Sequence, residues 1–517
     1  MTDFDVCIIG FGPTGAVAAA RLADAGHKVA VVDRLTDVYD RPRAIALDHE
    51  IMRLFQNMGV IEDILPHVAE YPASEYRGVD GRIIKRLDAA PPPYPQGWAP
   101  NYSFTQPPVE KRLRDRAASA GATLLLGHEL IALTEGSDHI EVELRDSDGA
   151  PVKLDARYVI GADGANSTVR RLSGLTLEDL DFDEPWLVVD VKVNEDTLAG
   201  LPSVNVQYCE PARPATYVVG PGAHRRWEIM LNEDEDPTAV MEPERVWELL
   251  SRWVNPATAT LWRSATYRFH AVVAPEWRKG HIILAGDAAH QQPPFLGQGM
   301  CQGLRDADNL AWKLNLVLRG LAPDTLLDSY GQERRDHVTR LISIIKTLGR
   351  FVCERDIEQA CRRDEMLIAE MGGGVVTTFR QDIMPKLETG FIASGANSGR
   401  GTLFPQPRIV DGKLLDQTLT PGFRLIVLGD AAQLPSIAPA ALPGITIARI
   451  SGAKSQVFEE PEARLFVETD NVASSWFERH NAVAALLRPD NYVYGTVSDI
   501  TLVPTLLKEC SVALSRA

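Results

Sequence analysis

A glycine-rich turn within the first fifteen residues constrains the fold of this 517-residue chain more than any other feature. Gly10, Gly12 and Gly15 follow a short apolar run, residues 5–9, and precede an Ala- and Leu-rich segment, residues 16–25. This order predicts a buried strand, a tight turn and a helix whose free N–H groups face a phosphate. We therefore expect the chain to begin with the first strand, turn and helix of a dinucleotide-binding domain.

The next segment completes this unit. Residues 28–32 read as a second strand, and Asp33 ends it. An acid about twenty residues past the glycines is expected to hold a ribose hydroxyl. A glycine turn in an unrelated α/β domain is the alternative, but the strand, the helix and the acid together favour a nucleotide site.

Two later turns indicate which nucleotide this is. Residues 161–164 (Gly-Ala-Asp-Gly) and Gly286-Asp287 each follow an apolar run that reads as a strand. Asp287, at the carboxyl end of its strand, is placed to accept hydrogen bonds from a ribose or ribitol hydroxyl. The helix predicted to start near Gly297 offers its positive end to the pyrimidine edge of a reduced flavin. Together, the three turns in this order predict a site for FAD.

Composition narrows the partners and the compartment. The net charge of −17, from 53 Lys and Arg against 70 Asp and Glu, argues against nucleic acid or an anionic membrane as a partner. No apolar run is long enough to span a bilayer, and the start lacks the basic region of a signal peptide, so we expect a cytoplasmic protein. The six cysteines are scattered without metal-ligand spacing, which predicts neither disulfides nor a metal site.

The three turns, together with residues 41–44 (Arg-Pro-Arg-Ala) and Gln106, resemble those of the single-component FAD-dependent aromatic hydroxylases, typified by p-hydroxybenzoate hydroxylase and phenol hydroxylase. The resemblance covers most of the chain and is strongest to the hydroxylases of 3-(3-hydroxyphenyl)propionate. It implies an oxidoreductase with bound FAD, a transient NADH or NADPH, and O2 as co-substrate. A flavin C4a-hydroperoxide would then hydroxylate a small phenol, with a meta-hydroxyphenyl carboxylic acid as the implied substrate and the position ortho to its hydroxyl as the site.

Two alternatives remain open from the residues. The same motifs serve hydroxylases of larger polycyclic or polyketide phenols. The same fold also serves FAD reductases that add no hydroxyl, and a flavin-binding sensor would need a similar cofactor site. The choice between NADH and NADPH, and the oligomeric state, with a homodimer as one option, are not readable from the sequence.

The resemblance implies an α/β fold with a Rossmann-like FAD-binding domain of the glutathione-reductase type, an inserted mixed β-sheet that binds substrate, and a thioredoxin-like C-terminal domain. Because that last domain lacks a CxxC motif, we expect packing or dimer contact from it and no redox exchange. The predicted boundaries are 1–75, 98–180 and 270–349 for the FAD domain, 76–97 and 181–269 for the sheet, 350–400 for a helical connection and 401–517 for the last domain.

Roles for individual residues follow from the motifs and from the resemblance. The predicted cofactor contacts are Gly10, Gly12, Thr14, Gly15, Asp33, Arg34, Arg43, Gln106, Asp163, Gly286, Asp287, Pro294, Gly297, Gln298, Gly299 and Met300. The predicted substrate contacts are Tyr102, Tyr208, Tyr217, Glu228 and Pro293. Tyr208 and Tyr217 could equally be core residues, because aromatic side chains at strand spacing more often pack in a core.

Three residues are predicted to be catalytic: Asp48, His49 and Arg226. A phenol has a pKa of about 10, so a base that removes its proton makes the ring more nucleophilic. The resemblance places Asp48 next to the phenol, with His49 as a relay, and Arg226 near the flavin. The competing interpretation of Asp48 is an acid in the first turn of a helix, where the helix dipole favours it.

Overall fold

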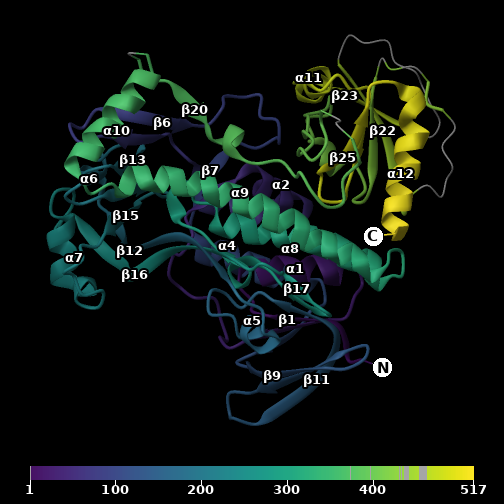
Figure 1. Cartoon of the computed structure of the whole chain (residues 1–517), viewed down its shortest axis with the longest axis horizontal. Helices are drawn as coiled ribbons and strands as arrows, with labels where there is room; N and C mark the ends of the chain where they lie inside the picture. The colour runs from purple at the N-terminus through teal and green to yellow at the C-terminus, as the bar shows by residue number, and fades with distance from the viewer. Residues whose placement is uncertain are drawn as a thin grey trace.

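The computed structural model describes residues 2–516 except 373, 396–397, 430, 432, 436–441 and 453–462. The predicted nucleotide-binding unit is present: β1 (Phe4–Ile9), α1 (Pro13–Asp24) and β2 (Val29–Asp33) follow one another, and the two strands pair in parallel. Figure 1 shows three further regions arranged around this unit, which are a second large sheet, a pair of long central helices and a separate C-terminal sheet.

An eight-stranded sheet carries the nucleotide-binding unit, and its central strands are parallel. Its main path runs through β17 (Arg278–Lys279), β18 (Ile282–Leu284), β11 (Pro151–Gly161), β1, β2 and β8 (Thr123–Leu126). Two antiparallel strands, β9 (Glu129–Glu135) and β10 (Ile140–Arg145), extend from β11. The carboxyl ends of β1, β2, β11 and β18 therefore lie at one edge, the place where open parallel sheets bind ligands.

A nine-stranded mixed sheet lies beside the first one. In order it contains β19 (His290–Gln291), β16 (Ala259–Val273), β12 (Glu178–Val193), β15 (His224–Met230), β14 (Ala215–Val219), β13 (Asn205–Tyr208), β5 (Ser74–Arg77), β6 (Ile83–Asp88) and β20 (Thr377–Phe379). One face of its centre packs on a separate apolar cluster around Trp227, Leu250 and Tyr217. Because side chains alternate along a strand, the residues next to Trp227 and Tyr217 on their own strands point to the opposite face of this sheet, toward the first sheet.

Helices cover the sheets and join the parts. α1 packs between α4 (Gln106–Ser119) and α8 (Gly299–Leu318), and α9 (Asp328–Cys353) crosses the molecule beside α8, as the green ribbon in Figure 1 shows. The remaining helices are α2 (His49–Asn57), α3 (Ile61–Ile64), α5 (Thr168–Ser173), α6 (Glu195–Leu198), α7 (Pro243–Leu250) and α10 (Ile357–Glu370). Short 3-10 turns include η3 (Gly286–Ala288), η4 (Pro294–Leu296) and η6 (Arg380–Ile383).

Two smaller sheets complete the described chain. The C-terminal one has the order β23 (Arg464–Glu468), β22 (Thr446–Gly452), β21 (Arg424–Leu428), β24 (Ala484–Leu487) and β25 (Val493–Val497), with α11 (Val472–Arg479) and α12 (Val503–Arg516) beside it. The other contains β3 (Ala46–Asp48), β7 (Asn101–Phe104) and β4 (Val68–Glu70).

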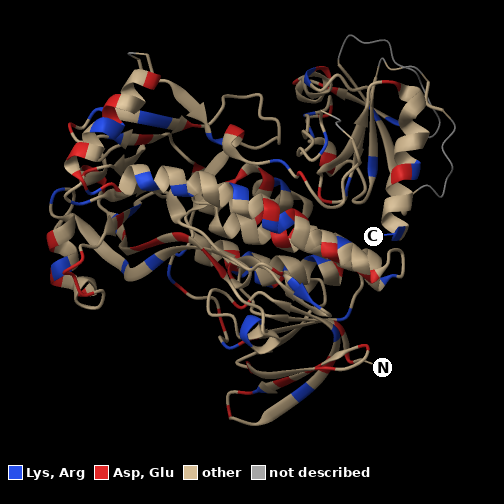
Figure 2. Cartoon of the chain, viewed as in Figure 1, with Lys and Arg blue, Asp and Glu red and all other residues tan. Residues whose placement is uncertain are grey.

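These elements agree with the predicted α/β class. The nine-stranded sheet draws strands from both segments assigned to the inserted sheet and adds β19 and β20 to them. The domain boundaries themselves stay a prediction. In the view of Figure 2, acidic and basic positions are interspersed along the helices and strands. Among the described residues, no helix has the length and apolar character needed to cross a bilayer.

Candidate active site

One elongated cleft lies at the carboxyl edge of the parallel sheet. It consists of two cavities, of about 390 and 270 Å³, which share four lining residues: Gly12, Arg43, Ala162 and Gly164. The smaller cavity extends along the ends of β1 and β2, and the larger one extends along the start of α8 and the edge strand β16. A long ligand with two different halves fits such a shape.

Most of the predicted cofactor residues line this cleft. Those in the smaller cavity are Gly10, Gly12, Asp33, Arg34, Arg43 and Asp163. Those in the larger cavity are Gly12, Thr14, Arg43, Gln106, Asp287, Pro294, Gly299 and Met300. Four predicted contacts do not line either cavity: Gly15, Gly286, Gly297 and Gln298. The motifs far apart in sequence therefore converge on one site, and the role of each residue toward a cofactor stays a prediction.

Glycine is required where β1 ends. Gly10 has φ +101°, and a Cβ there would overlap the backbone carbonyl of Ala162 in the second motif. A Cβ at Gly15 would overlap the carbonyl of Gly10. These two positions let the turn after β1, the start of α1 and the turn after β11 pack in backbone contact, so Gly15 acts on the cleft by shaping its wall.

Asp33 organises the end of the smaller cavity. Its Oδ2 accepts a hydrogen bond from the Phe11 N–H (2.7 Å) and its Oδ1 accepts one from the Leu35 N–H (2.8 Å). Each carboxylate oxygen can accept further bonds, so a ribose hydroxyl could still be held there. Arg114, from α4, also lines this cavity, and its Nε and Nη1 are buried without a hydrogen-bond partner in the described structure.

Gln106 lines the larger cavity, and its hydrogen-bond partner Glu110 lines the smaller one. The Gln106 Oε1 accepts a hydrogen bond from the Ala44 N–H (2.7 Å), and its Nε2 donates to Glu110 (2.9 Å). The Arg43 Nη2 donates to Glu110 at 2.6 Å, which holds the Arg43 guanidinium beside the cleft. Arg43 remains partly exposed and can still donate toward a pyrophosphate, the geometry for which a guanidinium is suited.

The third motif is anchored by a buried acid from α8. Asp306 accepts hydrogen bonds from the Gly286 N–H (2.9 Å) and the Arg334 Nε (2.8 Å), and the His290 Nε2 lies 2.8 Å from its Oδ2. Burial opposes ionisation, but the His290 and Arg334 charges hold the pKa of Asp306 below its usual range. His290 also stacks on Trp277, so its role is structural.

The larger cavity contains polar groups that lack protein partners. Both side-chain polar atoms of Gln292 are buried and unpaired within the described structure, and Gln292 lines the cavity. The start of α8 at Gly299 and Met300 also lines it, and no side chain caps that helix. Free N–H groups at a helix start and an unpaired amide suit the polar edge of a flavin. With the unpaired Nε and Nη1 of Arg114 at the other end, the residues of the cleft fit FAD.

Arg226 ties the nine-stranded sheet to the cleft. Its Nε and Nη2 donate to the two oxygens of Asp190 on the neighbouring strand (2.8 and 3.1 Å), and its Nη1 donates to the Arg43 carbonyl (2.8 Å). The His224 Nε2 lies 2.7 Å from the same Asp190. Arg226 therefore links β15 to Arg43, which lines both cavities, and its predicted catalytic role stays a prediction.

Glu228 lies two residues further along β15, on the same face. It is 6% exposed, and its nearest cation is Arg226, with 3.9 Å between Nη1 and Oε1. Burial raises the pKa of Glu228 to about 7, although Arg226 opposes the shift. The predicted substrate contact is thus a buried carboxyl that titrates near neutral pH.

Sequence reasoning missed Tyr71 and Arg380, which lie near Glu228. Burial raises the pKa of Tyr71, the Arg380 charge opposes this, and the Glu228 charge adds to it. The Arg380 guanidinium lies over the Tyr71 ring, 4.9 Å from its centroid, and donates to the Leu296 carbonyl (3.0 Å). No local motif marks these residues, because Arg380 reaches the sheet from a segment beyond α10.

The structure argues against Asp48 as the catalytic base. Asp48 is the N-cap of α2, where it accepts a hydrogen bond from the Ile51 N–H (3.2 Å), and it pairs with Arg305 at 2.6 Å. Although burial would raise it, the Arg305 charge holds the pKa of Asp48 below its usual range. Asp48, His49, Arg226 and Glu228 all lie outside the lining of the two cavities, and burial lowers the pKa of His49 to about 4. The competing helix-start interpretation of Asp48 agrees with this geometry.

The predicted substrate tyrosines lie elsewhere. Tyr208 and Tyr217 belong to the apolar cluster on the far face of the nine-stranded sheet, where they accept from Trp253 Nε1 (3.2 Å) and donate to the Pro202 carbonyl (3.1 Å), respectively. The Tyr102 hydroxyl accepts from the Ala99 N–H (3.0 Å). Pro293 is buried and does not line the cleft. The expectation that Tyr208 and Tyr217 form pocket walls is replaced by the alternative of core residues.

Comparison with known proteins agrees with this site. A family described as FAD binding domain matches residues 3–344, and one described as HcaD C-terminal domain matches residues 401–510. A probable NADH-specific resorcinol 4-hydroxylase of Rhodococcus jostii (strain RHA1) is 36% identical, with 99% of this chain and 95% of that protein covered. A 3-(3-hydroxy-phenyl)propionate/3-hydroxycinnamic acid hydroxylase of Mycobacterium sp. (strain JLS) is 32% identical, with coverage of 96% and 89%.

A solved structure shares the fold over the whole length. The crystal structure of aklavinone-11 hydroxylase with FAD and aklavinone has a TM-score of 0.77, 20% sequence identity and 99% coverage of both chains. The chain therefore belongs to the family of FAD-dependent aromatic hydroxylases. The predictions of this family, of FAD as cofactor and of an aromatic monooxygenase are confirmed.

Proposed function

We propose that this enzyme uses FAD, a nicotinamide donor and O2 to hydroxylate a small meta-substituted phenol at the position ortho to its hydroxyl. The observation that carries the proposal is the single cleft in which all three motifs meet, next to a sheet face that carries Arg226 and Glu228. The two relatives named above act on resorcinol and on 3-(3-hydroxyphenyl)propionate, which share a phenolic ring with a substituent meta to the hydroxyl.

The residues of this chain have separate tasks in that reaction. Asp33, Arg43 and Arg114 would hold the adenosine and pyrophosphate half of FAD, and Asp287, Gln292 and the start of α8 would hold the flavin half. Bound FAD supplies, after reduction and reaction with O2, the electrophilic oxygen that an electron-rich ring attacks. The protein's contribution is to orient the ring beside the flavin and to keep water away from it.

The C-terminal domain takes no part in this chemistry under the proposal. Its sheet has the order β23-β22-β21-β24-β25, in which β21, β22 and β23 are parallel and β24 is antiparallel to both β21 and β25; the four strands from β22 to β25 support a thioredoxin-like fold, with β23 as an additional edge strand. Buried ion pairs attach it to the rest of the chain: Arg53 with Asp416, and Arg488 with Glu333, at 2.7 and 2.8 Å. A packing role is consistent with these contacts, and the predicted homodimer stays a prediction.

The test is a product assay with FAD-loaded protein. Resorcinol and 3-(3-hydroxyphenyl)propionate are each supplied with NADH or NADPH in air, and NADH consumption, O2 uptake and product mass are recorded. We expect at least one phenol to stimulate NADH or NADPH oxidation and to gain one oxygen atom per donor consumed. Stimulated oxidation that yields only hydrogen peroxide with every phenol would contradict the proposal.

A further inference from the structure

Glu228 is a buried carboxylate with no hydrogen bond from the described part of the protein. Buried carboxylates are normally held by several donors, whereas the Glu228 oxygens have none among the described residues and retain a small exposed surface. Arg226, the nearest cation, directs its Nη1 hydrogen bond to the Arg43 carbonyl at 2.8 Å and lies 3.9 Å from Glu228. The protein thus leaves the acceptor capacity of this carboxylate free.

The strands place this free carboxylate beside the cleft. Arg226 and Glu228 share one face of β15, and Trp227 between them belongs to the apolar cluster on the opposite face. Arg226 contacts the backbone of Arg43, which lines both cavities. Glu228 itself lines neither cavity, and Arg226 links its strand to Arg43 in the wall of the cleft.

The neighbours across the sheet do not compete for Glu228. Its cross-strand neighbours are Thr216 on β14 and Val188 on β12. The Thr216 hydroxyl donates to Gln207 at 2.6 Å, and Val188 has no polar side-chain atom. The charged and titratable groups that face Glu228 are Arg226 from β15, Asp190 from β12, Tyr71 from the segment before β5 and Arg380 from η6, through Tyr71.

We propose that Glu228 is the general base that takes the hydroxyl proton of the phenolic substrate during hydroxylation. This inference rests on the proposed function and names the residue for the step that was first assigned to Asp48. Its support is geometric: a free carboxylate, buried, on the cleft side of the sheet, with a guanidinium beside it that can stabilise a phenolate.

The proton movement balances within the reaction. The phenolic O–H bond breaks, its electron pair stays on oxygen and enriches the ring, and the proton forms an O–H bond on the Glu228 carboxylate. The ring carbon takes a hydroxyl group, formally OH⁺, from the oxygen donor, whose O–O bond breaks and whose remaining oxygen keeps the electron pair and takes up a proton from water. The same ring carbon then loses its own proton to water as the ring regains aromaticity. Glu228 then returns its proton to the original phenolic oxygen, so that C–H has become C–OH and the carboxylate is restored.

The pKa of Glu228 suits a general base. A general base works best when its pKa lies near the operating pH, and burial raises the pKa of Glu228 to about 7. Asp48 does not have this property, because Arg305 and the Ile51 N–H already occupy its oxygens. Removal of a general base typically lowers a rate by roughly 10²–10⁴-fold.

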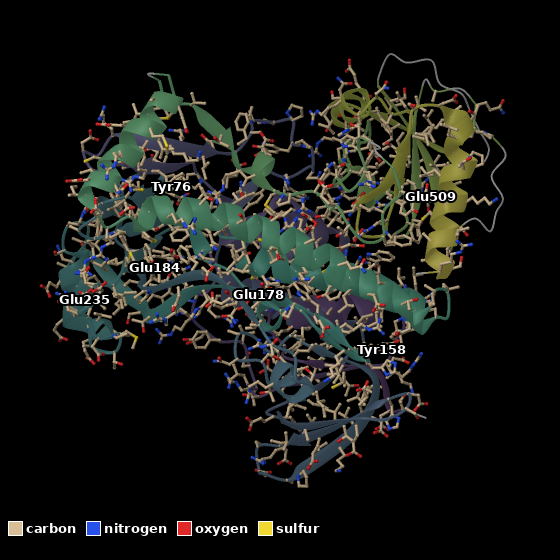
Figure 3. The ribbon with its side chains drawn as sticks, viewed as in Figure 1. Tyr76, Tyr158, Glu178, Glu184, Glu235 and Glu509 are labelled. Atoms are coloured by element: carbon tan, nitrogen blue, oxygen red, sulfur yellow. The ribbon has the colours of Figure 1, made fainter. Side chains whose placement is uncertain are left out.

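The test compares Glu228→Gln, Glu228→Asp and the control Glu184→Gln in the FAD-loaded enzyme. Glu184, labelled in Figure 3, is a half-buried acid on β12 of the same sheet. Burial also raises its pKa. Hydroxylated product per second is measured at saturating phenol from pH 5.5 to 9. The flavin absorbance of each variant checks that FAD is bound.

We expect the wild-type rate to rise through a midpoint near pH 7. Glu228→Gln should lose this midpoint and roughly 10²-fold or more of the rate, while NADH oxidation continues without product. Glu228→Asp should retain part of the rate, and Glu184→Gln should match the wild type. A ring-fluorinated, more acidic phenol should reduce the loss in Glu228→Gln, which a purely structural role would not do.

Two results would overturn the inference while leaving the proposed function intact. One is a Glu228→Gln enzyme with the product rate and pH profile of the wild type. The other is a loss in Glu228→Gln that is equally large for acidic and ordinary phenols. A wild type that makes no hydroxylated product from any phenol would instead overturn the proposed function, and the inference with it.

Discussion

The start of α2 and the centre of β15 each bury one carboxylate, and the protein treats the two in opposite ways. Asp48, at the start of α2, receives a backbone N–H and an arginine at 2.6 Å. Glu228, in β15, receives no hydrogen bond from the described chain, and its closest cation is at 3.9 Å. The first carboxylate is held ionised as part of the structure, whereas the second keeps its capacity to bind a proton.

The comparison shows that a carboxylate is assigned a role by its partners more than by its position in a motif. Asp48 follows the Arg-Pro-Arg-Ala segment closely, yet its oxygens are occupied. Glu228 lies far from the glycine motifs in sequence. The sheet nevertheless places it beside Arg226, which donates to the carbonyl of Arg43 in the cleft wall. The variants below test this contrast.

The largest effect on stability is expected for Arg305→Met, which removes the cation at the start of α2. It leaves the buried carboxylate of Asp48 and the half-buried carboxylate of Glu50 without their shared cation, which pairs with both at 2.6 Å. Loss of one partner of a buried pair costs about 3–5 kcal/mol, so the free energy of unfolding in urea should fall by that amount. Arg82→Met, which breaks the exposed pair with Asp80, should cost only about 0–1 kcal/mol. Equal losses in both variants would remove the basis of the comparison.

Glu228→Gln should raise the free energy of unfolding, whereas Arg305→Met should lower it. The folded pKa of Glu228, about 7, lies above the ordinary value of 4.5, so wild-type protein without FAD loses stability from this group as the pH rises through that interval. The variant lacks this loss and should gain about 3 kcal/mol relative to the wild type between pH 4.5 and pH 8. The measurement is urea unfolding at both pH values. A gain that does not depend on pH would show that Glu228 is ionised in the folded state throughout.

A smaller effect is expected for Asp48→Asn. Asparagine caps a helix as well as aspartate does, but the charged hydrogen bond with Arg305 is lost, at about 1.5–3 kcal/mol. Because the folded pKa of Asp48 is lowered, its stabilisation is present at neutral pH and is lost as the pH falls below its ordinary value. Unfolding at pH 7 and pH 3.5 measures this. The folded variant should form product at a rate that falls by much less than the roughly 10²-fold typical of a missing general base. A loss of that size would indicate that Asp48 is the base.

The smallest effect is expected for Tyr208→Phe, on the far face of the sheet. The variant loses only the hydrogen bond with Trp253 Nε1, at about 0.5–1.5 kcal/mol. Thermal unfolding should detect this change, while the KM for the phenol stays that of the wild type. A several-fold change in KM would show that this face takes part in binding substrate after all.

The cofactor cleft could be predicted from the sequence because its parts are local. A strand, a glycine turn and a helix lie within about thirty residues of one another, and the overlap that requires glycine at position 15 is with the Gly10 carbonyl in the same short segment. Arg114 and Gln292 were missed because the feature that marks them is the absence of hydrogen-bond partners for some of their side-chain atoms. Their buried, unpaired atoms appear only when all neighbouring elements are in place.

The substrate face was harder to predict for a different reason. Alternation along a strand shows that Arg226 and Glu228 share a face, but it does not show which face meets the cleft. For Tyr208 and Tyr217 the sequence therefore left substrate contact and core residue both open, and the structure places them in the apolar cluster. Arg305 reaches Asp48 from 257 residues away, so the sequence around Asp48 could not reveal that its oxygens are occupied.

The account depends first on the cleft being the site of FAD, and titration of protein with FAD tests this most directly. The wild type, Gly10→Ala and Gly59→Ala are compared; both glycines have a positive φ, but an added Cβ overlaps the Ala162 carbonyl only at Gly10 and meets nothing within 4 Å at Gly59. We predict one FAD bound per chain in the wild type and in Gly59→Ala, with binding lost in Gly10→Ala. A wild type that binds no FAD, or a folded Gly10→Ala that binds it as tightly as the wild type does, would contradict the account.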